Sequence, residues 1–253
     1  MGKNISYSLS PKIHKFLFKY SGIKADYSII NCEETDLLKI IYDSDFYGFN
    51  VTIPYKRSLN NFCTSEESIK TGSINTLSKL NGKITGYNTD IFGFIKAIEL
   101  VGISLSNVKS ATILGTGGVA QAIAYALSKN GISYKFVSRC KQGENIINYN
   151  NIENDKSELL INATPIGMPP QSNSLVLRQE ILKNYKYIMD TAYSLENTPL
   201  QKFAKENSIA FANGLIMLVA QAIQSQNIWF DNIHSGKENK LIKETIRNIK
   251  ESQ

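Results

Sequence analysis

The pattern of apolar and polar positions predicts strands that alternate with helices along most of the chain. In the clearest example, an apolar strand ending at Leu114 is followed by a glycine turn, an alanine-rich helix over residues 119–129 and a second strand over residues 132–137. Strands and helices in alternation are typical of a sheet covered by helices. The sequence therefore predicts an α/β fold with two such units, linked by a helix over residues 90–101.

Similar patterns predict the remaining elements, with turn residues between them. Before residue 90 they predict helices over residues 11–20 and 35–41, a strand-like segment over residues 26–31, a strand from residue 46 into a proline turn, and a hairpin turning at Asn81-Gly82. After residue 150 they predict strands that begin at residues 159, 187 and 209, and helices over residues 198–207, 213–225 and 237–250.

The glycine turn after Leu114 is the first candidate for chemistry. Small residues at Gly115, Gly117, Gly118 and Ala120 follow the pattern G-x-G-x-x-G/A between a strand and a helix. In that pattern the first glycine allows a tight turn, the second lets the backbone approach a pyrophosphate, and the last small residue lets helix and strand pack closely. The helix start also offers unpaired N–H groups to phosphates. We expect a dinucleotide here; the alternative is an ordinary tight turn.

The next strand bears on which dinucleotide binds. An NAD site usually carries an acidic residue about 20 residues beyond the glycines, which accepts from a ribose hydroxyl. This chain has Ser138, Arg139 and Lys141 in that region and no acid among them. A guanidinium can stack on adenine and bind a 2′-phosphate, which a carboxylate would repel. The sequence therefore favours NADP over NAD, with ordinary surface bases as the alternative.

Serines near the N-terminus form a second candidate site. Ser6, Ser8 and Ser10 alternate, so an extended chain would point them to one side, where their hydroxyls can bind a carboxylate or sugar-like hydroxyls. The alternative is a polar loop in which Ser10 caps a helix that starts at Pro11.

Polar residues at the ends of apolar segments extend the list of candidates. Thr52 and Lys56 follow an apolar strand, and Asn75 and Asp90 lie at element ends. Buried polar groups cost free energy unless they are bonded, so we expect such residues where a strand faces a ligand. For Asp90 the alternative is an N-cap of the following helix.

The later strands place further polar residues where a parallel sheet binds ligands. Asn162 and Thr164 follow the strand that begins at residue 159, and Tyr193 follows the strand that begins at residue 187. Ligands of such sheets bind at the carboxyl ends of the strands. We therefore expect Asn162 and Thr164 to meet the cofactor.

Composition narrows the class of protein. The 253 residues are 42% hydrophobic and 20% charged, as in a globular protein, and no apolar run approaches the roughly 20 residues of a membrane span. The three cysteines are scattered, which favours a reducing cytoplasm over disulfides, and the two histidines argue against a metal site. The net charge of +6 is spread out, so nucleic acid is not an expected partner.

Seven runs, in order and over most of the chain, resemble the shikimate dehydrogenase family. They are Ser-Leu-Ser-Pro at residues 8–11, Asn-Val-Thr-Ile-Pro-Tyr-Lys at 50–56, Gly-Ser-Ile-Asn-Thr-Leu at 72–77, Asn-Thr-Asp at 88–90, Gly-Thr-Gly-Gly at 115–118, Asn-Ala-Thr-Pro-Ile-Gly-Met at 162–168 and Gly-Leu-Ile-Met-Leu-Val-Ala-Gln-Ala at 214–222. The resemblance implies a substrate domain from residues 1–96 and 213–253, with a Rossmann-type NADP domain over residues 97–212 inserted between them.

The resemblance also implies an activity and its residues. The expected reaction is the reversible reduction of 3-dehydroshikimate to shikimate with NADPH, a step toward chorismate and aromatic amino acids, by a cytoplasmic monomer or homodimer that needs no metal. Lys56 and Asp90 would be the catalytic pair. The substrate would contact Ser8, Ser10, Thr52, Asn75, Tyr193 and Gln221. The cofactor would contact the glycine turn with Ala120, and also Ser138, Arg139, Lys141, Asn162, Thr164 and Gly214.

The residue types suit this chemistry. Hydride addition to a ketone leaves an alkoxide, whose charge an ammonium can stabilise and to which it can donate a proton. Two alternatives stay open: a quinate or dual-specificity dehydrogenase that uses NAD, and a cofactor- or metabolite-sensing protein without catalysis. The sensing alternative rests on the strand that usually precedes Gly2 in the family. The NAD alternative rests on Gly143, which stands where a second arginine is common.

Overall fold

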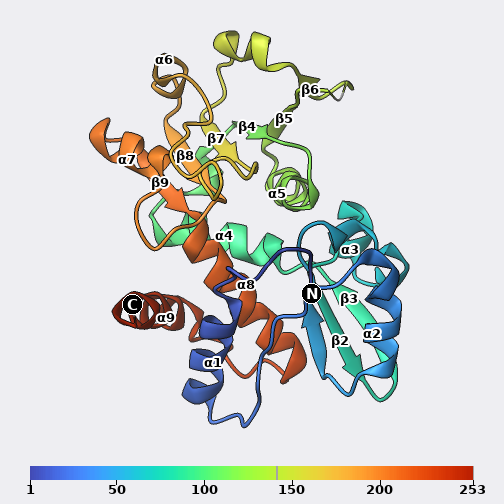
Figure 1. Ribbon diagram of the computed structural model, residues 1–253. Helices are drawn as coiled ribbons and strands as arrows, with labels where there is room; N and C mark the ends of the chain where they lie inside the picture. Colours follow the sequence, from blue (N-terminus) through green and yellow to red (C-terminus); the bar gives the residue numbers. More distant parts are fainter. Residues whose placement is uncertain (141, 253) are drawn as a thin grey trace. The chain divides into compact units, whose positions relative to one another are not determined.

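The computed structural model describes residues 1–140 and 142–252, and its chain divides into two compact units (Figure 1). The first unit holds Met1–Phe92 and Leu218–Gln253, and the second holds Gly93–Met217. The chain leaves the first unit within α4 (Asp90–Leu100) and returns within α8 (Gly214–Trp229). The domain boundaries expected from sequence, after residues 96 and 212, lie four and five residues from these crossings.

The first unit combines an antiparallel sheet with helices from both ends of the chain. Strands β1 (Gly48–Asn50), β2 (Thr76–Leu80) and β3 (Lys83–Tyr87) pair in the order β1-β2-β3, and the predicted hairpin turns at Asn81 and Gly82, both at positive φ. Its helices are α1 (Ser10–Ser21), α2 (Leu37–Asp43), α3 (Glu66–Thr71) and α9 (Glu238–Glu251), with the C-terminal part of α8. Leu37 and Ile41 of α2 pack with Phe49 and Leu77 in one buried cluster.

Residues 1–3 occupy a strand-like position in this unit. The N–H of Gly2 donates to Ile30 O and that of Cys32 donates to Gly2 O, at 3.2 and 3.1 Å. On the other side, Thr52 donates to Met1 O and Lys3 donates to Ile53 O, at 3.0 and 3.1 Å. Residues 1–3 therefore lie between the segments 30–32 and 52–53 and form backbone hydrogen bonds with both. The strand expected over residues 26–31 is wrong as a regular element, since its described part forms one bridge, between Gly2 and Asn31.

His14 is a packing residue of the first unit. It is fully buried on α1, its ring stacks on Tyr27 with centroids 4.1 Å apart, and its Nδ1 lies 3.1 Å from Nε2 of Gln226. Burial lowers the pKa of His14 to about 3, so the ring is neutral at physiological pH.

The second unit is a six-stranded parallel sheet of the Rossmann type (Figure 1). The spatial order is β6-β5-β4-β7-β8-β9, so the strand order reverses between β4 and β7. The strands are β4 (Ser110–Leu114), β5 (Ser133–Val137), β6 (Ile146–Ile147), β7 (Leu159–Asn162), β8 (Tyr187–Asp190) and β9 (Ala210–Asn213), and the helices are α5 (Gly118–Lys129), α6 (Gln179–Leu182) and α7 (Pro199–Glu206). This confirms the predicted α/β fold class with a parallel dinucleotide-type sheet.

Several short elements of the structure have no counterpart in the prediction. They include α3, α6, β6 and the 3₁₀ segment Tyr149–Asn154. Each has at most six residues, which is shorter than the window over which a hydrophobic period can be recognised. Within residues 1–140 and 142–252, no helix has both the length and the hydropathy to cross a bilayer.

A buried carboxylate joins strands β4 and β5 of the second unit to the segments that precede β7 and β8. The side chain of Asp155 has no exposed surface, and Lys135 of β5 lies 2.8 Å from its Oδ1. Thr112 of β4 and Tyr185 donate to Oδ2, the latter at 2.7 Å, and Ser157 donates to Oδ1. Burial alone would raise the pKa of Asp155, but these four donors together hold it below its ordinary value.

A second buried carboxylate lies at the end of β8, and its pKa is raised instead of lowered. Asp190 is 1% exposed, and its partners Asn162, Ala192 and Thr198 are neutral donors. Burial raises the pKa of Asp190 from 3.8 to about 6, against the smaller effect of these hydrogen bonds.

We expect Asp155→Ala to destabilise the protein by about 3–5 kcal/mol, because it leaves a lysine and three hydroxyls without their shared acceptor. Glu153→Ala is the matched control, since its ion pair with Arg178 is exposed (57% and 67%) and should contribute less than about 1 kcal/mol. Urea denaturation at neutral pH measures both. Equal midpoints for the two variants would contradict the structural importance of Asp155.

We expect the contribution of Asp190 to the free energy of unfolding to fall as pH rises. Its folded pKa lies above the unfolded value, so the protonated form is favoured in the folded state, and that stabilisation is complete below about pH 4 and lost through about pH 6. This rise in the pKa of Asp190 corresponds to roughly 3 kcal/mol. The free energy of unfolding of wild type minus that of Asp190→Asn should therefore fall by that amount between pH 4 and pH 7. A difference independent of pH would refute the raised pKa.

Candidate active site

Hydrogen bonds of Lys56 and of its neighbour Tyr55 hold the backbone at Lys56 in place. It lies in the 3₁₀ segment Tyr55–Arg57, which follows the proline turn after β1. The Tyr55 ring is buried and its hydroxyl donates to Cys32 O at 2.7 Å, while Lys56 O accepts from the N–H of Ile74 at 2.8 Å. The base of the lysine side chain is therefore fixed before any ligand binds.

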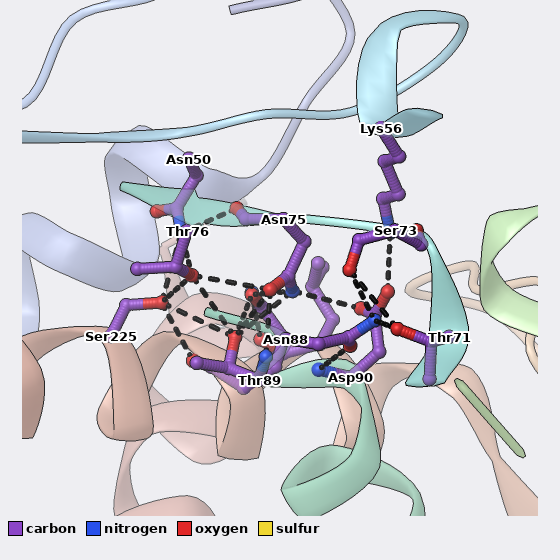
Figure 2. Close-up of polar contacts among 12 residues, drawn as sticks. Asn50, Lys56, Thr71, Ser73, Asn75, Thr76, Asn88, Thr89, Asp90 and Ser225 are labelled. Carbon is purple, nitrogen blue, oxygen red and sulfur yellow. Dashed lines mark hydrogen bonds and ion pairs between the residues drawn. The ribbon is translucent and has the colours of Figure 1, made fainter. Parts of the chain in front are cut away.

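Lys56 and Asp90 form a largely buried ion pair (Figure 2). Nζ lies 2.6 Å from Oδ2, and the two side chains are 14% and 7% exposed. Asp90 is the first residue of α4, and its own N–H donates to Oδ1 of Asn88 at 3.2 Å. The N-cap alternative for Asp90 is therefore wrong: its carboxylate binds Lys56 and Asn75, and Asn88 serves the backbone of the helix start.

Asn75 joins the ion pair to α8. Its Nδ2 donates to Oδ1 of Asp90 at 3.0 Å and lies 3.4 Å from Oε1 of Gln221. Its Oδ1 accepts from the N–H of Thr89 at 2.7 Å, which fixes which end of the amide faces Asp90. Gln221 in turn donates to Leu218 O at 2.8 Å. The structure thus brings together four residues that the sequence singled out: Lys56, Asn75, Asp90 and Gln221.

A second layer of polar side chains supports these groups (Figure 2). Thr89 contacts Asn75 and Gln221, and the hydroxyls of Thr76 and Ser225 lie 2.9 Å apart beside it. Asn50 donates to both hydroxyls, at 3.0 and 2.8 Å. Thr76, Thr89 and Ser225 were not predicted. Thr89 could have been found, because it lies between two residues of the Asn-Thr-Asp run, whereas Ser225 looks like any polar residue of a helix.

Of the three alternating serines near the N-terminus, two have their hydroxyls side by side and the third does not. Oγ of Ser6 accepts from Asn31, whereas the hydroxyls of Ser8 and Ser10 bond each other at 3.1 Å. The expectation that Ser10 caps α1 is wrong, because the helix begins at Ser10 and Oγ of Ser8 accepts from its N–H at 3.2 Å. Both are partly exposed, as is Thr52, so each can meet a ligand.

The glycine turn lies at the carboxyl end of β4, next to the reversal of strand order. Gly115 has φ +99°, which only glycine adopts without strain, and its N–H donates to Val137 O. A Cβ added to Gly117 would meet no atom within 4 Å, so the loop is open on that side. Gly118 starts α5 and Ala120 is fully buried in it. The turn has the form expected for a phosphate-binding loop.

The predicted 2′-phosphate residues follow β5, the neighbour of β4. Arg139 is exposed and Ser138 is half-buried, and Oγ of Ser138 accepts from the N–H of Cys140 at 3.3 Å. Burial raises the pKa of the Tyr149 phenol, and the charge of Arg139 offsets part of that rise. Lys141 lies outside the described residues.

Asn162 and Thr164 lie at the carboxyl ends of the sheet, but their side chains differ in access. Thr164 is half-buried, while Asn162 is fully buried and binds within the unit. Tyr193 is half-buried in the loop after β8, three residues beyond the strand. Gly214 is the first residue of α8, and a Cβ there would lie 2.3 Å from Thr191 O. Close packing therefore explains this glycine without a ligand.

Known proteins resemble this chain at the level of sequence. The profile of the shikimate dehydrogenase substrate binding domain matches residues 1–77. A curated relative from Clostridium beijerinckii, named Shikimate dehydrogenase (NADP(+)), is 34% identical over 243 residues, which are 90% of this chain and 90% of the relative.

Solved structures of similar proteins cover nearly the whole chain. Shikimate Dehydrogenase 1 from Peptoclostridium difficile has a TM-score of 0.89 at 30% identity, over 99% of this chain and 96% of its own. Shikimate 5-Dehydrogenase from Thermus thermophilus, in complex with NADP(H) and shikimate, has a TM-score of 0.86 at 25% identity, over 98% and 97%. Identity that extends over both units, with the same fold, shows that the chain belongs to the shikimate dehydrogenase family.

Proposed function

We propose that this chain catalyses the reversible, NADPH-dependent reduction of 3-dehydroshikimate to shikimate. Its relatives are named as NADP-dependent shikimate dehydrogenases, so it is an NADP-dependent oxidoreductase by family. The observation that carries the proposal is the 2.6 Å pair of Lys56 and Asp90, which lies beside the amides of Asn75 and Gln221 in one largely buried cluster.

The ion pair gives each member a distinct part. The ammonium of Lys56 stabilises the negative charge that develops on the ketone oxygen and donates the proton to it. Asp90 holds Nζ in place and accepts from a ring hydroxyl of the substrate with its remaining lone pairs.

The ring hydroxyls require partners that both donate and accept. The amide of Gln221 supplies both kinds of atom, since its Oε1 has contacts only at 3.4 Å, and we assign Gln221, Asn75 and Thr52 to these hydroxyls. The paired hydroxyls of Ser8 and Ser10 lie 3.1 Å apart, which suits the two oxygens of a carboxylate. Tyr193 belongs to the second unit, and its contact with substrate stays a prediction from the family resemblance.

The second unit supplies the residues for NADP. The backbone of Gly115, Gly117 and Gly118 and the start of α5 would hold the pyrophosphate, and Arg139 and Ser138 would hold the 2′-phosphate. Bound NADPH provides the hydride, while the protein provides geometry and charge. A dehydrogenase that acts on quinate or uses NAD is the alternative within the same chemistry. A sensing protein is the alternative outside it.

We expect Lys56→Ala to lower kcat about 10²–10⁴-fold while NADP binding stays nearly intact, because the variant loses a proton donor and not a cofactor contact. Absorbance of the nicotinamide, with shikimate and NADP, measures the turnover. Lys3→Ala is the matched control, since its ion pair with Glu33 is exposed (46% and 63%) and should leave kcat unchanged. Normal turnover by Lys56→Ala would sink the mechanism, and binding of both ligands by wild type without turnover would favour the sensing protein.

We expect kcat/KM with NADP to exceed that with NAD, and Arg139→Ala to raise KM for NADP about 10–100-fold with little effect on NAD, since it removes a charged hydrogen-bonding partner. Arg178→Ala, which removes another exposed guanidinium of the same unit, is the control. The same assay with quinate in place of shikimate decides the substrate. Equal rates with NADP and NAD would keep the reaction and remove the part given to Arg139.

A further inference from the structure

The buried carboxylate of Asp190 has no part in the proposed function, yet it ends β8 at the ligand-binding edge of the sheet. Asp190 is 1% exposed, and in the part of the chain that the structure describes its hydrogen-bond donors include no ammonium or guanidinium. Desolvating a carboxylate without a cation is costly, which raises its pKa to about 6. Such a group is tolerated where its hydrogen bonds position other parts of the protein.

On one side, Asp190 holds the loop that follows β7. Its Oδ1 accepts from Nδ2 of Asn162 at 2.8 Å, and the same Nδ2 donates to Ile166 O at 3.0 Å. Oδ1 of Asn162 accepts from both the N–H and the hydroxyl of Thr164, at 3.0 and 2.6 Å. An amide side chain has two N–H donors and two lone pairs, so every polar position of Asn162 is occupied. Asn162 therefore acts on a ligand through Thr164 and not by direct contact.

On the other side, Asp190 holds the loop that follows β8. Oδ1 accepts from the N–H of Ala192 at 3.0 Å, and Oδ2 accepts from the hydroxyl of Thr198 at 2.9 Å. Thr198 is the N-cap of α7, where its Oγ1 accepts from the N–H of Gln201. The loop between these contacts carries Tyr193. One carboxylate thus fixes both ends of this loop.

Two glycines show how closely both loops pack. A Cβ on Gly167, in the loop after β7, would lie 3.7 Å from Oδ2 of Asp190. A Cβ on Gly214 would lie 2.3 Å from Thr191 O and 2.6 Å from Ala192 O, distances that no real side chain reaches. The loop after β8 is therefore packed tightly against the start of α8, and Gly167 lies at ordinary contact distance from the carboxylate.

We propose that Asp190 is a positioning residue for the nicotinamide half of NADP, acting through Thr164 and through the loop that carries Tyr193. A fold of this type binds a dinucleotide with two halves, one on each side of the strand reversal. The glycine turn and Arg139 belong to the β4–β5 half, whereas both loops held by Asp190 belong to the β7–β8 half. The proposal rests on the proposed function, because it requires NADP at this edge.

The hydrogen bonds, and not the negative charge, carry this positioning. In Asp190→Asn, the amide oxygen can still accept from Asn162 and Ala192, and the amide nitrogen can donate to the hydroxyl of Thr198, which also accepts. In Asp190→Ala, all three contacts are lost. The first variant should therefore retain the loop positions and the second should lose them.

The test compares two ligands that differ in the half they occupy. Calorimetry measures Kd for NADPH and for adenosine 2′,5′-bisphosphate, which lacks the nicotinamide half, and the nicotinamide absorbance measures kcat with shikimate. We expect Asp190→Ala to weaken NADPH about 10-fold and lower kcat about 10–100-fold, with the bisphosphate unchanged within about 2-fold, since small misplacements of a reacting group are costly. For Asp190→Asn, the two Kd values and kcat should each stay within about 3-fold of wild type.

Asp155→Ala is the matched control, because it removes a buried carboxylate of the same unit that contacts neither loop in the bonds described above. A merely structural role for Asp190 predicts that both alanine variants change the two ligands alike, and that result would overturn the proposal. So would an Asp190→Asn variant as impaired as Asp190→Ala. If wild type binds NADPH without oxidising shikimate, the proposed reaction fails while the two binding constants still decide this proposal. If wild type binds neither ligand, both fall.

Discussion

The ion pair of Lys56 and Asp90 is the interaction on which the first unit's candidate site depends. It joins the 3₁₀ segment after the proline turn to the first residue of α4, and Asn75 adds the start of β2. A pair this close and this buried persists only where further hydrogen bonds complete it, because each charge has lost most of its water. Asn75 supplies one of these bonds and is itself oriented by the backbone N–H of Thr89. These three segments are distant in sequence, and they are held together because buried polar groups need hydrogen-bond partners.

The second unit meets the same requirement with carboxylates of opposite behaviour. Asp155 has a lysine partner, and the net effect of its surroundings lowers its pKa. Asp190 has only neutral donors, and burial raises its pKa to about 6. Because both are nearly inaccessible, the difference follows from the partners and not from exposure. Asp155 ties together the body of the sheet, whereas Asp190 ties together the loops beyond its edge.

Much of this arrangement could be predicted from sequence, and the rest could not for physical reasons. The glycine turn and the hairpin at Asn81-Gly82 are local, since backbone conformation there is set by the residues themselves. Lys56 and Asp90 could be identified from the family pattern, but their contact joins residues 34 positions apart and needed the structure. Ser10 is not a cap, because α1 already begins at Ser10 and Ser10's own N–H donates to Oγ of Ser8. Ser225 and Asp190 gave no signal, because their importance lies in partners that only the fold brings near.

The contacts around Gln221 indicate how the site can exchange its internal bonds for those of a ligand. Nδ2 of Asn75 has two hydrogens but three acceptors nearby, and Oε1 of Gln221, at 3.4 Å, is the farthest of them. The hydroxyl of Thr89 is also 3.4 Å from that oxygen. Both distances are near the limit at which a hydrogen bond contributes, so a substrate hydroxyl that donates to Oε1 replaces weak contacts with a strong one. The short bonds that orient Asn75 and hold Lys56 need not break. Under the proposed function, the site is thus rigid where the proton is transferred and adaptable where the ring hydroxyls bind.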